Sequence, residues 1–217
     1  EINAGAKEVI KSGVLKGVSA IAGFHNKPDL PLGTIGIKSG PLMAAVDRFE
    51  VKINGTGTHA AAPQNGNDPI VTASQIVTSI QSIVSRYVSP VDMAIISVTK
   101  ISGGNTWNVI PESVIMEGTM RTFKESVQER IKKLFTQVIK NYTEAFDQKY
   151  EISWGDAHSF VDNDKILAEA IGKETSIFAD VKVPEITTGG EDFSFYQKEV
   201  PGLFAFIGTG CPYEWHN

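Results

Sequence analysis

The stretch Asp68-Pro-Ile-Val-Thr-Ala-Ser-Gln-Ile-Val-Thr-Ser-Ile-Gln-Ser-Ile-Val84 decides the fold of this chain. Its apolar residues return every three or four positions, which predicts an amphipathic helix with one buried stripe. Proline directly after Asp68 suits the first turn of that helix. Residues 126–146 have the same periodicity and predict a second long helix. Both helices therefore bury one face against other parts of the chain.

Short apolar segments surround the two helices at 49–53, 93–101, 114–123 and 150–154. Several of them alternate apolar and polar residues, as half-exposed strands do. The resulting order, β-α-β-β-α-β, is that of the split βαβ or ferredoxin-like arrangement. We therefore expect a ferredoxin-like α+β domain at residues 44–157, with a four-stranded antiparallel sheet and two helices on one face.

The residues on either side of this domain have α/β character. Helices are expected at 4–11 and 163–176, a short strand at 33–37, and strands buried on both faces at 18–24 and 202–208. We expect residues 1–43 and 158–217 to form one partial α/β domain into which the ferredoxin-like domain is inserted. Neither flank is long enough for a complete sheet with helices on both faces. The chain also begins at Glu1 without a methionine, so we expect a fragment whose missing part precedes Glu1.

Composition excludes several classes of protein. Hydrophobic residues make up 41% of the 217 residues and charged residues 21%, as in ordinary globular proteins. The net charge of −5 is spread along the chain without a basic block, which argues against nucleic-acid binding. The apolar runs are far shorter than the roughly 20 residues that span a membrane. The single cysteine, Cys211, excludes an internal disulfide framework and favours a reducing, cytoplasmic location.

Two histidines are candidate functional residues. His59 lies in Gly55-Thr-Gly-Thr-His59-Ala-Ala-Ala-Pro63, where small neighbours would let the backbone approach whatever the imidazole contacts. His25 is expected just beyond the carboxyl end of strand 18–24, the edge at which open α/β sheets bind ligands. The alternatives are an idle loop histidine and a strand cap. His158 lies in no motif and is expected at the surface.

Eight short motifs together indicate a family. They are Glu1-Ile-Asn-Ala-Gly-Ala-Lys7, Ala22-Gly-Phe-His25, Ser39-Gly-Pro-Leu-Met-Ala44, Gly57-Thr-His59-Ala-Ala-Ala-Pro63, Asn108-Val-Ile-Pro111, Gly118-Thr-Met-Arg-Thr-Phe123, Gly189-Gly-Glu-Asp-Phe193 and Trp215-His216-Asn217. In this order and spacing the chain resembles the carboxyl-terminal portion of the M20 family of metallopeptidases and amidohydrolases. The most similar branch contains hippurate hydrolase, aminoacylase and N-acyl-amino-acid amidohydrolases. Each motif is weak alone, but the series covers essentially the whole chain.

The resemblance implies a metal site in the zinc-peptidase-like α/β domain. Members of the family hold two divalent metal ions there, usually zinc and sometimes manganese, cobalt or nickel. Glu1 resembles the second residue of the family's Glu-Glu pair, a metal ligand. His25 resembles the next ligand and His216 the last. Carboxylate and imidazole ligands suit zinc and its neighbours, so the residue types agree with the resemblance.

The chain also departs from the family pattern. The general-base glutamate would immediately precede Glu1, and the upstream cysteine and histidine ligands are absent as well. Cys211 is not placed to replace them. Glu191 and Asp192 resemble residues that fix a loop, and we leave them out of the metal set. We therefore expect the isolated chain to be inactive and doubt that it holds both metal ions.

The ferredoxin-like domain is expected to contribute to the site as well. In the family it pairs two subunits as a homodimer, and His59 would enter the partner's active site to stabilise the oxyanion. Asn108 and Arg121 resemble residues that bind the carboxylate or carbonyl of the substrate, and an arginine fork fits a carboxylate. Turn capping by Asn108 and a surface ion pair of Arg121 are the alternatives. The backbone N–H groups of Gly189 and Gly190 are candidates for binding a carboxylate.

The expected activity of the parent protein is hydrolysis of the amide bond of N-acyl amino acids, acetylated or hippurate-like, by metal-activated water. The small-molecule partner would therefore be an N-acyl amino acid or a short peptide. A dipeptidase or aminopeptidase of the M20 family and an N-acetyl-diaminopimelate deacetylase are alternatives. A non-catalytic dimerisation module is the alternative of a different class.

Overall fold

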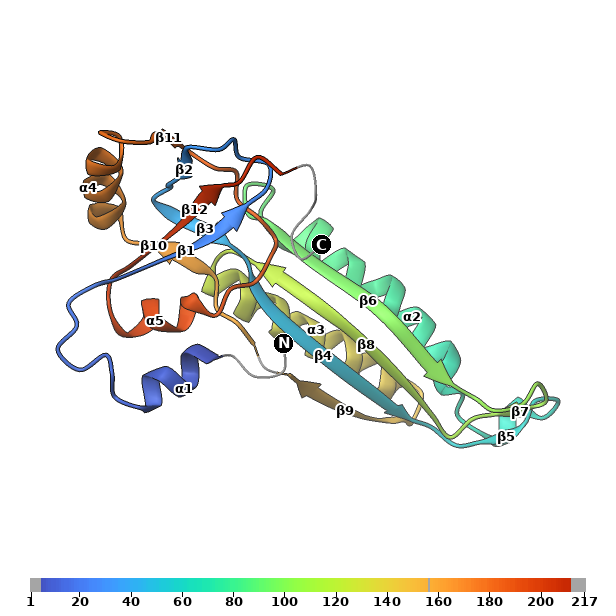
Figure 1. The fold of residues 1–217 in the computed structure, drawn as a ribbon. Helices are drawn as coiled ribbons and strands as arrows, with labels where there is room; N and C mark the ends of the chain where they lie inside the picture. The colour runs from blue at the N-terminus through green and yellow to red at the C-terminus, as the bar shows by residue number, and fades with distance from the viewer. Residues whose placement is uncertain (1–4, 156, 212–217) are drawn as a thin grey trace. The chain divides into compact units, whose positions relative to one another are not determined.

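The computed structural model describes residues 5–155 and 157–211. It divides into two compact units (Figure 1). The insert unit comprises residues 46–157, and the flank unit comprises residues 1–45 and 158–217. Within the described residues, no helix is both long and apolar enough to cross a lipid bilayer.

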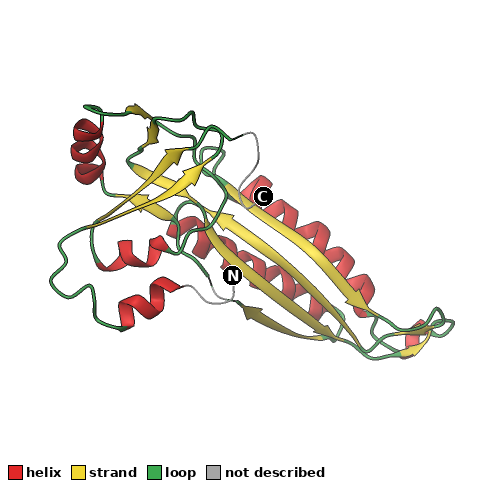
Figure 2. Cartoon of the chain, in the orientation of Figure 1, coloured by secondary structure: helices red, strands yellow, loops and turns green. Residues whose placement is uncertain are grey.

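The insert unit has the ferredoxin-like arrangement that the sequence predicts. Its sheet has the order β6-β8-β4-β9, in which β4 pairs with β9 and β6 pairs with β8 in antiparallel fashion. Helices cover one face of the sheet (Figure 2). The elements are β4 (Ala45–Asn54), α2 (Pro69–Ser82), the π-helical turn η2 (Ile83–Tyr87), β6 (Ala94–Gly103), β8 (Ser113–Thr122), α3 (Glu125–Ala145) and β9 (Lys149–Trp154). The predicted order and both predicted helices are confirmed.

Alternation along β4 builds the core of the insert unit. Phe49, Val51 and Ile53 are fully buried against the helices, while the residues between them face the opposite side of the sheet. The rings of Phe49 and Phe135 pack with centroids 4.7 Å apart. Helix α2 begins at Pro69 because the Asp68 carboxylate accepts the N–H of Ile70 at 2.8 Å.

A short two-stranded ribbon extends from one end of this sheet (Figure 1). It pairs β5 (Thr58–His59) with β7 (Val109–Ile110), and the turn η1 (Pro63–Asn65) follows β5. Glycine is required where its backbones approach closely. A Cβ atom at Gly66 would lie 2.5 Å from the carbonyl oxygen of Thr56, which no side chain tolerates. The ribbon is therefore a tightly packed extension of the sheet.

The flank unit is an α/β sandwich. Its four-stranded sheet has the order β1-β12-β2-β11, with β1 and β12 parallel. Alternate residues of β12 face opposite sides, Leu203 in the cluster with α4 and Phe204 in the cluster with α5. The elements are α1 (Gly5–Lys11), β1 (Ile21–Lys27), β2 (Thr34–Gly36), β3 (Gly40–Met43), β10 (Val161–Asn163), α4 (Lys165–Thr175), β11 (Asp180–Lys182), α5 (Phe193–Glu199) and β12 (Gly202–Gly208). The α/β character predicted for the flanks is confirmed.

The prediction for strand β1 is wrong in two respects. The strand runs from Ile21 to Lys27 rather than from 18 to 24, so His25 lies within it and not beyond its end. Its residues alternate between half-buried and exposed, and Phe24 is 70% exposed. The reason is its position at the end of the described sheet, where it pairs with β12 on one side.

A buried asparagine connects three parts of the flank unit. The Asn163 side chain donates to the carbonyls of Lys38 and Phe204 at 2.9 and 2.8 Å. Its Oδ1 accepts the Phe204 N–H at 2.7 Å and the Gln197 Nε2 at 3.1 Å. These bonds join β10, β12 and α5, and β12 in turn pairs with the strand that carries His25.

Candidate functional site

The ribbon holds His59 with a defined tautomer. The Ala61 N–H donates to His59 Nδ1 at 3.1 Å, so Nδ1 is an acceptor and the ring hydrogen is on Nε2. The His59 side chain is exposed and lies opposite Val109 in the ribbon. Its Nε2–H is therefore a hydrogen-bond donor presented at the end of the insert unit.

Asn108 lies beside His59 on the same ribbon. Its carbonyl accepts the Ala60 N–H at 2.9 Å, and its side-chain Oδ1 accepts the Thr106 hydroxyl at 3.3 Å. The second bond joins two side chains of the same turn and does not decide between turn capping and substrate binding for this residue. The structure thus brings His59 and Asn108 together. It also shows what the sequence analysis missed: Trp107, between the two bonded residues, is 92% exposed.

Arg121 lies at the other end of the sheet. On β8 it pairs with Ile95 of β6, whereas the ribbon strand β7 leads into the start of β8 at Ser113. Eight residues at about 3.3 Å each place the two ends about 25 Å apart. Within one chain, Arg121 therefore cannot contact the same small molecule as His59 and Asn108.

The surroundings of Arg121 are polar. Its Nη1 donates to the Met120 carbonyl at 3.0 Å and to the Thr119 hydroxyl. Burial lowers the pKa of Arg121, and the nearby Asp47 carboxylate offsets part of that shift. The nearest glutamate along the strand, Glu117, forms ion pairs with two other cations, Arg48 at 2.7 Å and Lys100 at 2.5 Å.

His25 has the opposite tautomer to His59. Its Nδ1 lies 2.8 Å from the Asn26 carbonyl oxygen, which can only accept, so Nδ1 carries the hydrogen. In the neutral ring the lone pair is then on Nε2. A ligating histidine commonly has its second nitrogen bonded to a carbonyl in this way.

The segment 187–193 lies close to His25. Burial raises the pKa of Glu191, the Phe193 N–H lowers it, the Asp192 side chain raises it and the neighbouring His25 lowers it. Asp192 accepts the Ala6 N–H at 2.9 Å and so holds the start of α1. The Gly189 N–H donates to the Thr187 hydroxyl at 3.2 Å, within its own loop. Gly190 follows in the same loop.

The other two expected metal ligands, Glu1 and His216, lie outside the described residues. Among residues 5–155 and 157–211, no group of three or more His, Cys, Asp or Glu side chains could hold a metal ion. His25 is the one expected ligand that lies within the described residues, and its imidazole is a residue type that suits the expected set of one carboxylate and two imidazoles. The surface prediction for His158 is wrong, because its ring packs on Phe195 with centroids 5.8 Å apart and its Nδ1 is buried.

Two hollows lie at the base of the ribbon. One of about 670 Å³ is lined by both ribbon strands and the turn 102–105. The other, of about 390 Å³, is lined by Lys52, Asn54 and Glu112. His59 lines neither hollow. Its side chain is exposed to solvent.

Comparison with known proteins covers the whole chain. The N-acetyl-L-cysteine deacetylase of Bacillus subtilis is 46% identical, over 100% of this chain and 52% of the relative. The IAA-amino acid hydrolase ILR1-like 4 of Arabidopsis thaliana is 37% identical, over 94% of this chain and 48% of the relative. The chain thus spans about half the length of the curated relatives it matches.

A solved structure and a sequence-family model also match this chain. The crystal structure of the Bacillus subtilis YXEP protein, described as a dinuclear metal-binding peptidase from the M20 family, matches with a TM-score of 0.84 and 38% identity, covering 98% of this chain and 54% of that one. Residues 46–147 match the peptidase dimerisation domain of the M20 family. The chain therefore belongs to the M20 family of metallopeptidases and amidohydrolases.

Proposed function

We propose that the protein containing this chain is a metal-dependent amidohydrolase that cleaves the amide bond of N-acyl amino acids. The observation that carries the proposal is the Nε2–H of His59, held outward on the ribbon beside Asn108. The substrate class is supported by relatives named as deacetylases of N-acetylcysteine and as a hydrolase of an amino acid conjugate. In this proposal the flank unit binds metal and the insert unit is the dimerisation or lid domain.

The flank unit would hold a pair of divalent metal ions. His25 would bind through Nε2, with Glu1 and His216 as further ligands, and zinc, manganese, cobalt and nickel all accept this donor set. Such ions supply Lewis-acid chemistry that polarises the carbonyl and activates water. The Asn26 carbonyl keeps the His25 ring oriented for that role. The base that takes the proton from water would come from the glutamate expected before Glu1.

The insert unit would serve two different sites. His59 donates from Nε2 to the carbonyl oxygen of the scissile amide as negative charge develops there. Asn108 binds the same carbonyl group. Arg121 binds the substrate carboxylate, with the Gly190 N–H as a further candidate, whereas the Gly189 N–H would first have to leave the Thr187 hydroxyl. The separation of about 25 Å between Arg121 and the ribbon requires two subunits for one complete site. We therefore propose that His59 and Asn108 act in the partner's site.

A homodimer formed through the insert unit would supply that arrangement. Strand β6 ends the sheet order and pairs with β8 on one side. It exposes Ile95 (42%) and Ile101 (55%), two apolar residues on an edge strand. An edge strand of ten residues is a template for pairing with another copy of itself. A cytoplasmic location is also proposed, because Cys211 is a free, exposed thiol.

Subunit complementation in the complete enzyme tests this proposal. His25→Ala and His59→Ala each remove one part of the site, and each homodimer is expected to be nearly inactive towards N-acetyl amino acids. If His59 acts across the dimer, a random mixture of the two variants regains about a quarter of wild-type activity, because half the dimers are mixed and each has one intact site. If both residues act within one chain, mixing restores nothing.

The substrate panel separates the alternatives. N-acetylcysteine, N-acetyldiaminopimelate and a dipeptide are compared on the wild-type enzyme, because relatives include an N-acetyldiaminopimelate deacetylase and a carboxypeptidase. Cleavage of the dipeptide alone would favour a peptidase. Absence of both bound metal and hydrolysis in the complete protein would favour a non-catalytic dimerisation module.

The dimer has its own test. Ile101→Lys is expected to convert the dimer to monomer in light scattering, because a charge would enter the paired edge. Ile166→Lys is the matched control, since Ile166 is 76% exposed on α4 of the flank unit. A dimer that persists in Ile101→Lys would exclude the β6 edge.

A further inference from the structure

Trp107 is the most exposed of the large apolar side chains at the end of the ribbon. It is 92% exposed, whereas Val109, which faces His59, is 43% exposed. Tryptophan is highly buried on average in folded proteins. Exposed aromatic side chains on a rigid extension are typical of residues that are buried on binding.

Hydrogen bonds involve both neighbours of Trp107 along the chain. On one side of it, the Thr106 hydroxyl donates to Asn108 Oδ1 at 3.3 Å. On the other side, the Asn108 carbonyl accepts the Ala60 N–H at 2.9 Å, one residue after His59. Trp107 and His59 are therefore carried on the same ribbon, with backbones about 10 Å apart or less on the spacing of adjacent strands. If the His59 imidazole enters the partner's site, the Trp107 indole therefore lies close to that site as well.

The chemistry of the indole distinguishes between the two ends of an N-acyl amino acid. In the proposed function, His59 donates to the carbonyl oxygen of the scissile amide. The acyl substituent is bonded directly to that carbonyl carbon, so it lies next to His59. The opposite end carries a carboxylate, which needs a cation or N–H donors. An uncharged aromatic ring favours an apolar substituent instead.

We propose that Trp107 is a specificity-determining residue that packs against the acyl group of the substrate in the partner's active site. The inference rests on the proposed function, because it requires that His59 reaches that site. It adds a preference for substrates with bulky apolar acyl groups. The position of Trp107 beside His59 and its apolar ring both support that preference.

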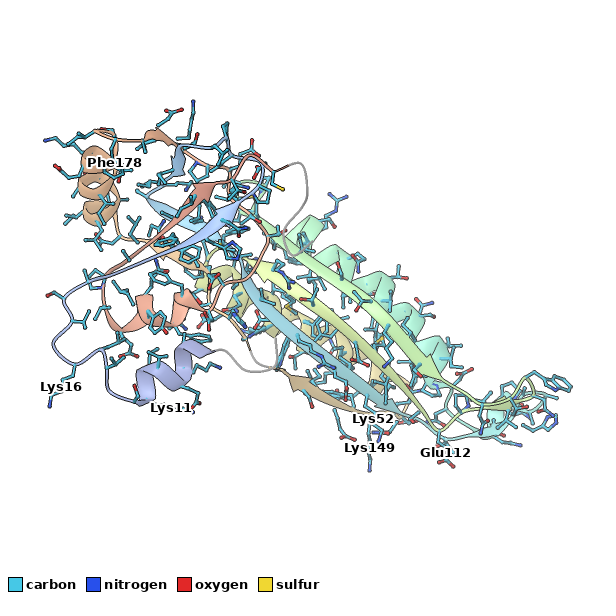
Figure 3. All side chains as sticks on the ribbon, viewed as in Figure 1. Lys11, Lys16, Lys52, Glu112, Lys149 and Phe178 are labelled. Carbon is cyan, nitrogen blue, oxygen red and sulfur yellow. The ribbon has the colours of Figure 1, made fainter. Side chains whose placement is uncertain are left out.

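The test compares N-benzoylglycine with N-acetylglycine on the complete enzyme. Trp107→Ala is expected to lower the ratio of kcat/KM for benzoyl over acetyl by about 10- to 100-fold, the range for losing part of an apolar pocket. Trp107→Phe keeps an aromatic ring and should retain most of the ratio. Phe178→Ala, at an 80% exposed aromatic residue of the flank unit, is the matched control and should leave the ratio unchanged (Figure 3).

Complementation then assigns the contact to one subunit. When Trp107→Ala is placed in the His25→Ala chain, the ribbon that serves the intact site is altered, and the ratio should fall. When Trp107→Ala is placed in the His59→Ala chain, the altered ribbon reaches the inactive site that lacks His25. The ratio should then stay at the wild-type value.

The outcomes are distinguishable. A wild-type enzyme that cleaves neither these two substrates nor the N-acetyl amino acids of the panel above overturns the proposed function and this inference with it. The inference alone is overturned if the enzyme is active and Trp107→Ala leaves the ratio of kcat/KM unchanged. This includes the case in which kcat/KM falls equally for both substrates. The same holds if the ratio falls when the change is in the His59→Ala chain. Loss of the dimer in Trp107→Ala would instead assign the residue to subunit contact, and it would also overturn the inference.

Discussion

Replacing Asn163 with leucine should weaken the flank unit strongly. Leucine has nearly the shape of asparagine, so the change removes hydrogen bonds without opening a cavity. Asn163 is 3% exposed and makes the four hydrogen bonds described above. At about 1 kcal/mol each the loss is about 4 kcal/mol, and Phe204 is left with a buried N–H that lacks its acceptor. That is a large part of the stability of a typical domain.

Two measurements check this prediction. Urea unfolding of the chain gives the change in free energy, and hydrogen exchange of the Phe204 amide reports the local bond. The Phe204 amide should exchange at least about 100-fold faster in Asn163→Leu, since about 3 kcal/mol of local protection would be lost. Asn105→Leu, in an exposed turn, is the control and should change the stability by less than about 0.5 kcal/mol. Unchanged protection of Phe204 would refute the proposed role of the buried amide.

Three further changes probe the insert unit. Phe49→Ala, in the centre of the core, should cost about 3–5 kcal/mol in thermal or urea unfolding, against about 0.5 kcal/mol for Phe146→Ala at a half-exposed site. Hydrogen bonds from Lys100 and Arg48 lower the pKa of Glu117, so its stabilisation is present above the unfolded-state pKa and is lost as pH falls through the folded-state pKa. Glu117→Gln should therefore remove the loss of unfolding free energy at acid pH that Glu117 causes. An unchanged dependence of stability on pH would contradict this role of Glu117. Asp68→Ala should cost about 1 kcal/mol through the start of α2, measured against Asp68→Asn, which retains a capping oxygen.

Features set by local periodicity could be predicted from the sequence. Helices α2 and α3 begin and end within one or two residues of the predicted bounds, because a stripe at 3.6-residue spacing is visible in any window. The order of strands in the insert unit also followed, since two such helices between four strands leave few arrangements.

Features that depend on distant residues could not be predicted. The bounds of β1 are set by pairing with β12, which lies about 180 residues later, so its apolar run gave the wrong end and misplaced His25. The Asn163 network joins residues 38, 163, 197 and 204, and no local pattern marks it. For the candidate site, the sequence identified His59, Asn108 and Arg121 but not their grouping. Their separation follows from the length and direction of β8.

The two histidines show how little residue identity alone determines chemistry. His25 and His59 have the same side chain, yet a carbonyl oxygen contacts Nδ1 in one and an amide hydrogen contacts it in the other. Each backbone group therefore fixes the role of Nε2 in the neutral ring, which is an acceptor in His25 and a donor in His59. The backbone next to each histidine, in β1 and in β5, thus decides which hydrogen-bonding role the same side chain has.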